Sequence, residues 1–396
     1  MRTKLLTLAL FAVTLGAVLF YPKLQARHAT IETPQSSQHI VAVAPKIDVV
    51  FALDTTGSMS GLIEAAKEKI WSIASSMASA QPTPEIRIGL VAYRDRGDAY
   101  VTRVVDLSSD LDSVYASLMD FQADGGGDTP ESVNQALFDA VHAMAWTEQE
   151  QAYRVIFLVG DAPPHMDYNE AKYPEIVAVA RLKGIVINTI QCGTISDTAD
   201  PWNAIASLGG GDFLHVDQAG SAVAIETPFD AELAELAARL DDTRLYYGSE
   251  EDKAKMKKKV IATDKLSASA PVSARARRAV FNSGEGGRKN LLGDNELVDA
   301  VASGEVSLDE IDADALPEPL KPMAPEEQVQ HIAALAEERT ELQKKIRELG
   351  DSRQAYIAGK EEEAGGFEDS LDRKLYDVVA KQAEAAGFEY REGPEY

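Results

Sequence analysis

The sequence of 396 residues contains one cysteine, Cys192. A single cysteine excludes an intramolecular disulfide and any metal site built from several cysteines. Because no cysteine lies near the N-terminus, a lipoprotein anchor is excluded as well. So little cysteine is compatible with an oxidising compartment without being specific to one.

Positive charge is scarce, with 39 Lys and Arg residues against 64 Asp and Glu, which gives a net charge of −25. Such an acidic chain argues against nucleic acid as a partner. A phosphate-binding loop is also lacking, because the glycines at 284–287 are not followed by Gly-Lys-Ser/Thr. No nucleophile–base–orienter set typical of hydrolases can be recognised.

The first 26 residues contain a hydrophobic run, residues 5–21, which follows Arg2 and Lys4. A positive start followed by an apolar run of this length predicts a signal peptide or a signal-anchor. No Ala-x-Ala triplet follows at once, which favours the uncleaved anchor. We therefore expect an exported protein, periplasmic or otherwise extracytoplasmic, that residues 5–21 could tether to the inner membrane, with a linker at 27–45.

Strand and helix patterns alternate from residue 46 to about 245. The predicted strands are 47–53, 86–93, 101–107, 153–159, 185–191 and 212–216. The predicted helices are 61–79, 110–120, 130–145, 169–183, 202–208 and 229–241. This alternation predicts an α/β fold, a doubly wound and mostly parallel sheet with helices on both faces. The connection between the second and third strands is too short for a parallel crossover, so that pair is expected to be an antiparallel hairpin at one edge.

The most informative motif is Asp54-Thr55-Thr56-Gly57-Ser58, directly after the first predicted strand. It places one carboxylate and two hydroxyls, those of Thr56 and Ser58, on a strand-to-helix turn. Oxygen ligands of this kind suit Mg²⁺ or another hard cation. The carboxyl ends of parallel strands form the usual ligand-binding edge of such a sheet, so we expect a cation site there.

The Asp-x-Thr-x-Ser pattern resembles the metal-ion-dependent adhesion site of von Willebrand factor type A domains. That family completes its site with a Thr and an Asp from two further loops. Thr129, in Gly-Gly-Gly-Asp-Thr-Pro-Glu, and Asp161, after the fourth predicted strand, match these positions. The resemblance covers residues 46–245 and implies Mg²⁺, Mn²⁺ or Ca²⁺ held by Asp54, Thr56, Ser58, Thr129 and Asp161. The family more often has Ser at position 56, and Thr keeps the hydroxyl.

Alternatives remain open for several of these residues. Thr129 could instead cap a helix that begins at Pro130, and Asp128 could be the metal ligand in its place. Asp161 could bind the metal directly or contact the groups that bind it. Asp95 lies in Tyr-Arg-Asp-x-Gly-Asp, which resembles a motif of some bacterial members of the family, and could contact a partner or sit in a turn. His165 could bind a ligand, act as a base or simply be exposed.

Residues 246–396 are rich in Ala, Glu and Lys and predict a mainly helical C-terminal region. In the predicted helix 326–349, Leu335, Leu342 and Leu349 occupy one heptad position, but Arg339 interrupts the other. A charge on the seam argues against a coiled coil and favours an intramolecular hairpin with a helix at 371–386. We find no catalytic motif in this region.

Three functions are compatible with these observations. The resemblance implies a non-enzymatic adaptor of the cell envelope, whose bound metal is completed by an Asp or Glu of a partner protein. A metal-dependent hydrolase could use a metal-bound water near Asp95 or His165. A structural or assembly protein would act through its C-terminal helices, with the metal stabilising the fold.

Overall fold

The computed structural model describes residues 44–396, except 128, 219–224, 365–369, 391–392 and 394–396. The predicted signal segment (1–26) and nearly all of the predicted linker (27–45) therefore lie outside the described residues. Within the described part of the chain, no helix is both long enough and apolar enough to cross a bilayer.

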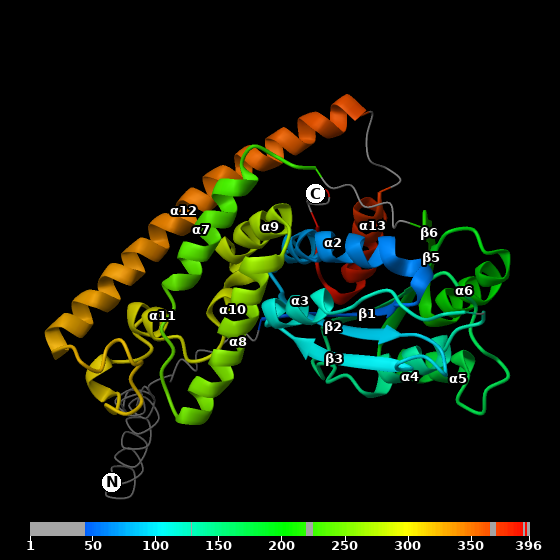
Figure 1. The fold of residues 1–396 in the computed structure, drawn as a ribbon, viewed down its shortest axis with the longest axis horizontal. Helices are drawn as coiled ribbons and strands as arrows, with labels where there is room; N and C mark the ends of the chain where they lie inside the picture. Colours follow the sequence, from blue (N-terminus) through cyan, green and yellow to red (C-terminus); the bar gives the residue numbers. More distant parts are fainter. Residues whose placement is uncertain (1–43, 128, 219–224, 365–369, 391–392, 394–396) are drawn as a thin grey trace, which may run out of the picture. The chain divides into compact units, whose positions relative to one another are not determined.

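The core of the fold is a six-stranded sheet with the strand order β3-β2-β1-β4-β5-β6 (Figure 1). The strands are β1 (Lys46–Asp54), β2 (Glu85–Tyr93), β3 (Thr102–Ser108), β4 (Tyr153–Gly160), β5 (Ile185–Cys192) and β6 (Gly210–Val216). β3 pairs antiparallel with β2, and every other neighbouring pair is parallel. The predicted mostly parallel sheet and its antiparallel edge hairpin are both confirmed.

Helices follow most strands and continue through the C-terminal region. The first group is α2 (Ser60–Ala78), α3 (Leu111–Met119), α4 (Val133–His142), α5 (Tyr173–Leu182), α6 (Ser196–Gly209) and α7 (Asp230–Asp242). The second group is α8 (Glu250–Ser269), α9 (Val272–Ser283), α10 (Arg288–Leu292), α11 (Leu297–Ala302), α12 (Pro325–Ala364) and α13 (Leu371–Ala383). The helical C-terminal region is thus confirmed.

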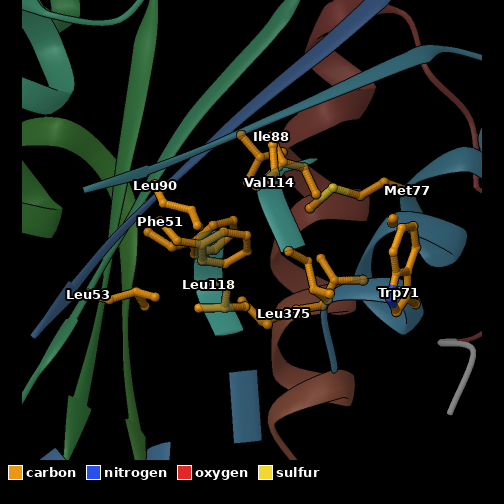
Figure 2. Close-up of a cluster of buried hydrophobic side chains, with 14 of the residues drawn as sticks. Phe51, Leu53, Trp71, Met77, Ile88, Leu90, Val114, Leu118 and Leu375 are labelled. Atoms are coloured by element: carbon orange, nitrogen blue, oxygen red, sulfur yellow. The ribbon is translucent and has the colours of Figure 1, made fainter. Parts of the chain in front are cut away.

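Both faces of the sheet are buried, because the side chains of a strand alternate between its two faces. Val49, Phe51 and Leu53 of β1 enter one hydrophobic cluster, whereas Val50 and Ala52 enter another. Helices α4, α5 and α6 contribute to the second cluster. The first is covered by α2 and α3 together with residues that come from far along the chain (Figure 2).

The helix that closes this first cluster is α13, at the end of the chain. Its residues Leu371, Leu375 and Val379 are buried with Phe51 and Trp71, and Figure 2 shows Leu375 beside the side chains of the sheet. Residues of α8 and α9 join the same cluster. The hydrophobic core therefore continues across the predicted boundary near 245, and residues 44–396 form one compact unit.

The expected hairpin between the helix at 326–349 and the helix at 371–386 is wrong. α12 packs against α7, α9 and α11, whereas α13 packs against α2 and β6. Arg339, the charge on the predicted seam, is buried and donates hydrogen bonds to both carboxylate oxygens of Glu296, at 2.9 and 3.0 Å. It also donates to the carbonyl oxygen of Thr243 at 2.8 Å. A charge on the apolar face of α12 is thus accommodated by a buried ion pair with Glu296, the N-cap residue of α11.

Candidate metal centre

The Asp54 carboxylate lies at the carboxyl end of β1 and is fully buried. Its Oδ1 accepts hydrogen bonds from the backbone nitrogen of Thr56 at 2.8 Å and from Thr56 Oγ1 at 2.6 Å. Thr56 Oγ1 lies 3.4 Å from Ser58 Oγ. The structure therefore brings Asp54, Thr56 and Ser58 together, as the motif predicts, with Ser58 on the exposed side.

The other oxygen of this carboxylate, Asp54 Oδ2, is buried and accepts no hydrogen bond from any residue that the structure describes. Burial raises the pKa of Asp54 to about 7; the hydrogen bonds from Thr56 oppose that rise and the nearby Asp161 charge adds to it. A buried carboxylate without a partner is unfavourable, and a cation is one way to compensate it. The free oxygen thus fits a metal ligand.

The glycine-rich loop before α4 packs directly on this turn. Gly57 donates a backbone hydrogen bond to the carbonyl of Gly125 at 3.1 Å. Gly126 has φ +67°, and a Cβ at this position would lie 2.8 Å from Thr56 Cβ. Thr129 is exposed on the same loop, between Gly126 and Glu131. Because α4 begins at Val133, Thr129 does not cap it; Asp128 lies outside the described residues.

Asp161 follows β4 and is buried at the same edge. A Cβ on the preceding residue, Gly160, would lie 3.0 Å from Asp54 Cβ, which shows how closely the ends of β1 and β4 approach. Asp161 Oδ2 accepts a hydrogen bond at 2.8 Å from Gln218, which follows β6. Gln218 was not predicted as a site residue, because nothing in its local sequence distinguishes it.

Asp95 and His165 lie at this edge too, where they join two loops. Asp95 accepts hydrogen bonds from Ser132 Oγ at 2.8 Å and Tyr168 OH at 2.7 Å. His165 stacks on Tyr168 with 3.8 Å between ring centroids, and its Nε2 lies 3.4 Å from Asp95 Oδ2. His165 is 8% exposed, so it is a packed histidine rather than a freely exposed one.

Glu131 is the buried carboxylate that the sequence analysis did not single out. It is 3% exposed, and its Oε2 accepts no hydrogen bond within the described part of the chain. Burial, together with the charges of Asp54, Asp95, Asp98 and Asp161, raises the pKa of Glu131 to about 9. Glu131 is the last residue of the motif that contains Thr129, but its burial depends on the packing of two other loops.

The nearby positive charges are engaged elsewhere. Arg94 donates to the carbonyl oxygens of Thr55 and Gln122, at 3.1 and 2.8 Å, and Arg96 pairs with Glu170. Within the described residues, no three His, Cys, Asp or Glu side chains are arranged as a metal site. The predicted set depends instead on two carboxylates, Asp54 and Asp161, supplemented by hydroxyl groups. These oxygens are the type that hard divalent cations bind.

Comparison with known proteins places the sheet in a known family of domains. A sequence model described as the von Willebrand factor A domain matches residues 48–218. These residues form a von Willebrand factor A (VWA) domain. The match covers all of β1 except its first two residues and the whole of β2 to β6, and the helices beyond α6 lie outside it.

Similar proteins share this part of the chain. A putative ariadne-like RING finger protein of Acanthamoeba polyphaga mimivirus is 21% identical over 198 residues, which are 46% of this chain and 19% of that protein. The human von Willebrand factor A domain-containing protein 7 is 26% identical over 186 residues, 44% of this chain and 20% of that protein. The matches thus span about a fifth of the length of these relatives. Among solved structures, BatB from Bacteroides thetaiotaomicron is 19% identical, with a TM-score of 0.33 over 43% of this chain and 90% of that one.

Proposed function

We propose that the VWA domain binds a divalent cation, Mg²⁺ or alternatively Mn²⁺ or Ca²⁺, and uses it to bind a partner protein. Asp54, Thr56, Ser58, Thr129 and Asp161 would hold the cation. The observation that carries this proposal is Asp54 Oδ2, which is buried without a hydrogen-bond partner among the described residues, although the residues around it supply oxygen ligands. VWA domains commonly act as metal-dependent protein-interaction modules.

The partner would contribute an Asp or Glu side chain. Mg²⁺ prefers six oxygen ligands and keeps several waters when the protein supplies few of them. With two carboxylates in the proposed set, the bound cation would remain accessible to a carboxylate of the partner on the side of Ser58, which is exposed. Asp95 and His165 would line this edge, and Asp128, which lies outside the described residues, stays a candidate contact from the sequence alone. No role for nucleic acid is proposed, in keeping with the net charge of −25.

We further propose that the domain binds its partner without catalysing a reaction. His165 is the candidate base at this edge, but its Nε2 is buried and directed towards Asp95. A base in this position is poorly placed to accept a proton from a metal-bound water. Hydrolysis of generic ester substrates that requires Mg²⁺ and is lost in Asp54→Ala would contradict this.

The proposed setting is the cell envelope, with the N-terminal segment as export signal or membrane tether. The support is the sequence pattern of residues 5–21, which lie outside the described residues. Fractionation of cells that express the full chain would test this, since recovery in the cytosol would contradict export.

Replacing Asp54 with Ala should abolish metal-dependent binding. We expect Mg²⁺ at 100 times its Kd to stabilise the native protein by about 2.7 kcal/mol, and expect Asp54→Ala to lose this gain. The same variant should no longer capture a partner from envelope extract in the presence of Mg²⁺. Thermal unfolding with and without EDTA gives the first result, and a pull-down gives the second.

Asp124→Ala is the matched control, because it removes one negative charge nearby from a side chain that is 81% exposed. It should keep both the Mg²⁺ gain and the partner. Equal capture by wild type, Asp54→Ala and chelated protein would refute the proposed function and direct attention to the C-terminal helices.

Replacing Gly126 with Ala should weaken cation binding without altering any proposed ligand. The added Cβ would meet Thr56 Cβ at 2.8 Å, in a backbone conformation with φ +67° that L residues rarely adopt. We expect at least a tenfold loss of Mg²⁺ affinity by calorimetry. Gly127→Ala is the control, because a Cβ there meets nothing within 4 Å; equal losses in both variants would argue against this reason.

A further inference from the structure

The glycine-rich loop that carries Thr129 has little local restraint on its backbone. Gly125 and Gly126 have φ of +73° and +67°, in the region that favours glycine. Because glycine has no side chain to restrict it, such a segment has access to many backbone conformations. The position of Thr129 relative to the Asp54–Ser58 turn therefore depends on contacts that other segments make with these two glycines.

Asp98, on the turn that follows β2, supplies one of these contacts. The backbone nitrogen of Gly126 donates to both oxygens of the Asp98 carboxylate, with Oδ1 at 3.4 Å and Oδ2 at 3.2 Å. A Cβ built on Gly125 would overlap the same carboxylate. The Asp98 side chain thus packs directly on two consecutive glycines of the loop, 28 residues along the chain.

The turn that carries Asp98 is itself held in place. Asp98 Oδ2 accepts a hydrogen bond from the backbone nitrogen of Asp95 at 3.3 Å, and Asp95 Oδ1 accepts one from Ser132 Oγ at 2.8 Å. The backbone nitrogen of Arg94 donates to the carbonyl of Val101 at 3.0 Å, just before β3 begins. The carboxylate of Asp98 is therefore presented to the glycines from an anchored segment.

We propose that Asp98 is a positioning residue of the cation site, which holds the glycine-rich loop where Thr129 can reach the cation without binding the cation itself. This inference rests on the proposed function. Both oxygens of Asp98 accept from a backbone nitrogen, whereas Asp54 Oδ2 has no donor among the described residues. Groups that hold metal ligands in place, without being ligands, typically change metal affinity about 10–100-fold when they are replaced.

Two substitutions separate positioning from a direct effect of charge. Asp98→Ala removes both acceptors, whereas Asp98→Asn removes the charge and keeps one carbonyl oxygen for the Gly126 nitrogen. We expect the Kd for Mg²⁺ to rise at least about tenfold in Asp98→Ala and less than about threefold in Asp98→Asn. If Asp98 bound the cation or acted on it through its charge, Asp98→Asn would lose as much affinity as Asp98→Ala.

The cation-free protein provides a second readout. In EDTA, peptides that contain Gly125 and Gly126 should exchange their amide hydrogens faster in Asp98→Ala than in wild type, because the Gly126 nitrogen loses its acceptor. The experiment is calorimetric titration of the purified full chain with Mg²⁺ alone, together with hydrogen–deuterium exchange and melting temperatures in EDTA. A side chain that only supported the fold would lower the melting temperature and leave the Kd of the folded protein unchanged.

Asp124→Ala is the matched control. It removes a carboxylate from the same loop whose side chain is 81% exposed, and leaves the backbone hydrogen bond from the Asp124 nitrogen to the carbonyl of Thr55 in place. Since exposed charges are well screened, the Kd should change by less than about twofold, and exchange at Gly125 and Gly126 should match wild type.

Three results would overturn the inference: a Kd for Asp98→Ala within twofold of wild type, unchanged exchange in that variant, or equal losses of affinity in Asp98→Asn and Asp98→Ala. Should Asp98→Ala fail to fold, Asp98→Asn still decides, because a tenfold weaker Kd in Asp98→Asn would contradict positioning by hydrogen bonds.

Asp54→Ala separates this result from the proposed function. Wild type that binds Mg²⁺ and Asp54→Ala that does not, with Asp98→Ala unchanged, would overturn the role of Asp98 alone. Wild type that binds no Mg²⁺ would overturn both.

Discussion

A chain that ends at residue 364, before α13, should not unfold in a single cooperative transition. The deletion removes six buried hydrophobic residues from the cluster that covers one face of the sheet: Leu371, Leu375, Val378, Val379, Ala383 and Phe388. Their burial contributes on the order of 10 kcal/mol, which is comparable to the whole stability of a typical domain. It also removes Asp372, whose carboxylate lies 2.8 Å from the buried ammonium of Lys69. Urea denaturation followed by circular dichroism measures the effect.

Point variants on α13 separate this packing effect from a general effect of truncation. Leu375→Ala should cost about 2–5 kcal/mol, because Leu375 is 3% exposed and lies among side chains of the sheet and of α2 and α3 (Figure 2). Lys381→Ala on the same helix should change stability by less than about 0.5 kcal/mol, since its side chain is 72% exposed. A fragment of residues 46–245 that unfolds cooperatively at the same urea concentration as the full chain would show that α13 is dispensable.

Replacing Asp112 with Ala should destabilise the protein by about 3–5 kcal/mol, because it removes one partner of a buried ion network. Asp112 on α3 is fully buried and accepts two hydrogen bonds from Arg278 on α9, both at 2.6 Å. Lys259 on α8 lies 3.6 Å away. The variant would leave Arg278 with Asp241 alone as a carboxylate partner. Urea midpoints at pH 7 measure the cost.

The pH dependence provides a second test of the same network. Burial alone would raise the pKa of Asp112, but the charges of Arg278 and Lys259 outweigh it and hold the pKa well below its usual range. The carboxylate therefore contributes stability above the unfolded pKa of about 3.9 and loses it as the pH falls below that value. The stability difference between wild type and Asp112→Asn should shrink below about pH 4.

Asp120→Asn is the matched control for this series. Asp120 also pairs with a lysine of α8, Lys265, at 2.7 Å, but its side chain is 70% exposed. An exposed pair contributes about 1 kcal/mol or less, so we expect a small effect with little pH dependence. Equal losses in Asp112→Asn and Asp120→Asn would contradict the importance of burial.

Much of the fold could be predicted because its signals are local. Residues 47–53 have the apolar pattern of a buried strand, and the structure contains β1 at Lys46–Asp54. The seven residues Arg94–Tyr100 are too few for a parallel crossover, so the antiparallel pairing of β2 and β3 followed from chain length alone. The Asp54–Ser58 turn was predictable for the same reason, since its contacts join residues two apart.

The surroundings of the candidate site were less predictable. Glu131 stands in the motif that was used to assign Thr129, but its burial results from hydrogen bonds to Pro163 and His165, which are more than 30 residues away. Gln218 contacts Asp161 across 57 residues. His165 could have been exposed, and only its stacking on Tyr168 and its position beside Asp95 show that it is packed. Assigning these roles requires knowing which loops meet.

The C-terminal helices show the same limit most clearly. The pattern of residues 371–386 indicates a helix with an apolar face, but not which surface that face covers. The structure places it on the main sheet rather than on α12. In the sequence, Arg339 likewise only interrupts the apolar heptad positions of the helix at 326–349. The tertiary structure alone shows that Glu296 is its partner.

The sequence by itself determined the order of the strands along the chain, the antiparallel edge, and the carboxylate and hydroxyl groups at the end of β1. These follow from periodicity, chain length and turn chemistry, which act over a few residues. Only the tertiary structure decided that α13 completes the core and that two buried carboxylate oxygens, Asp54 Oδ2 and Glu131 Oε2, have no hydrogen-bond donor among the described residues. Burial and electrostatic coupling are set by the packing of distant segments, and no local pattern encodes them.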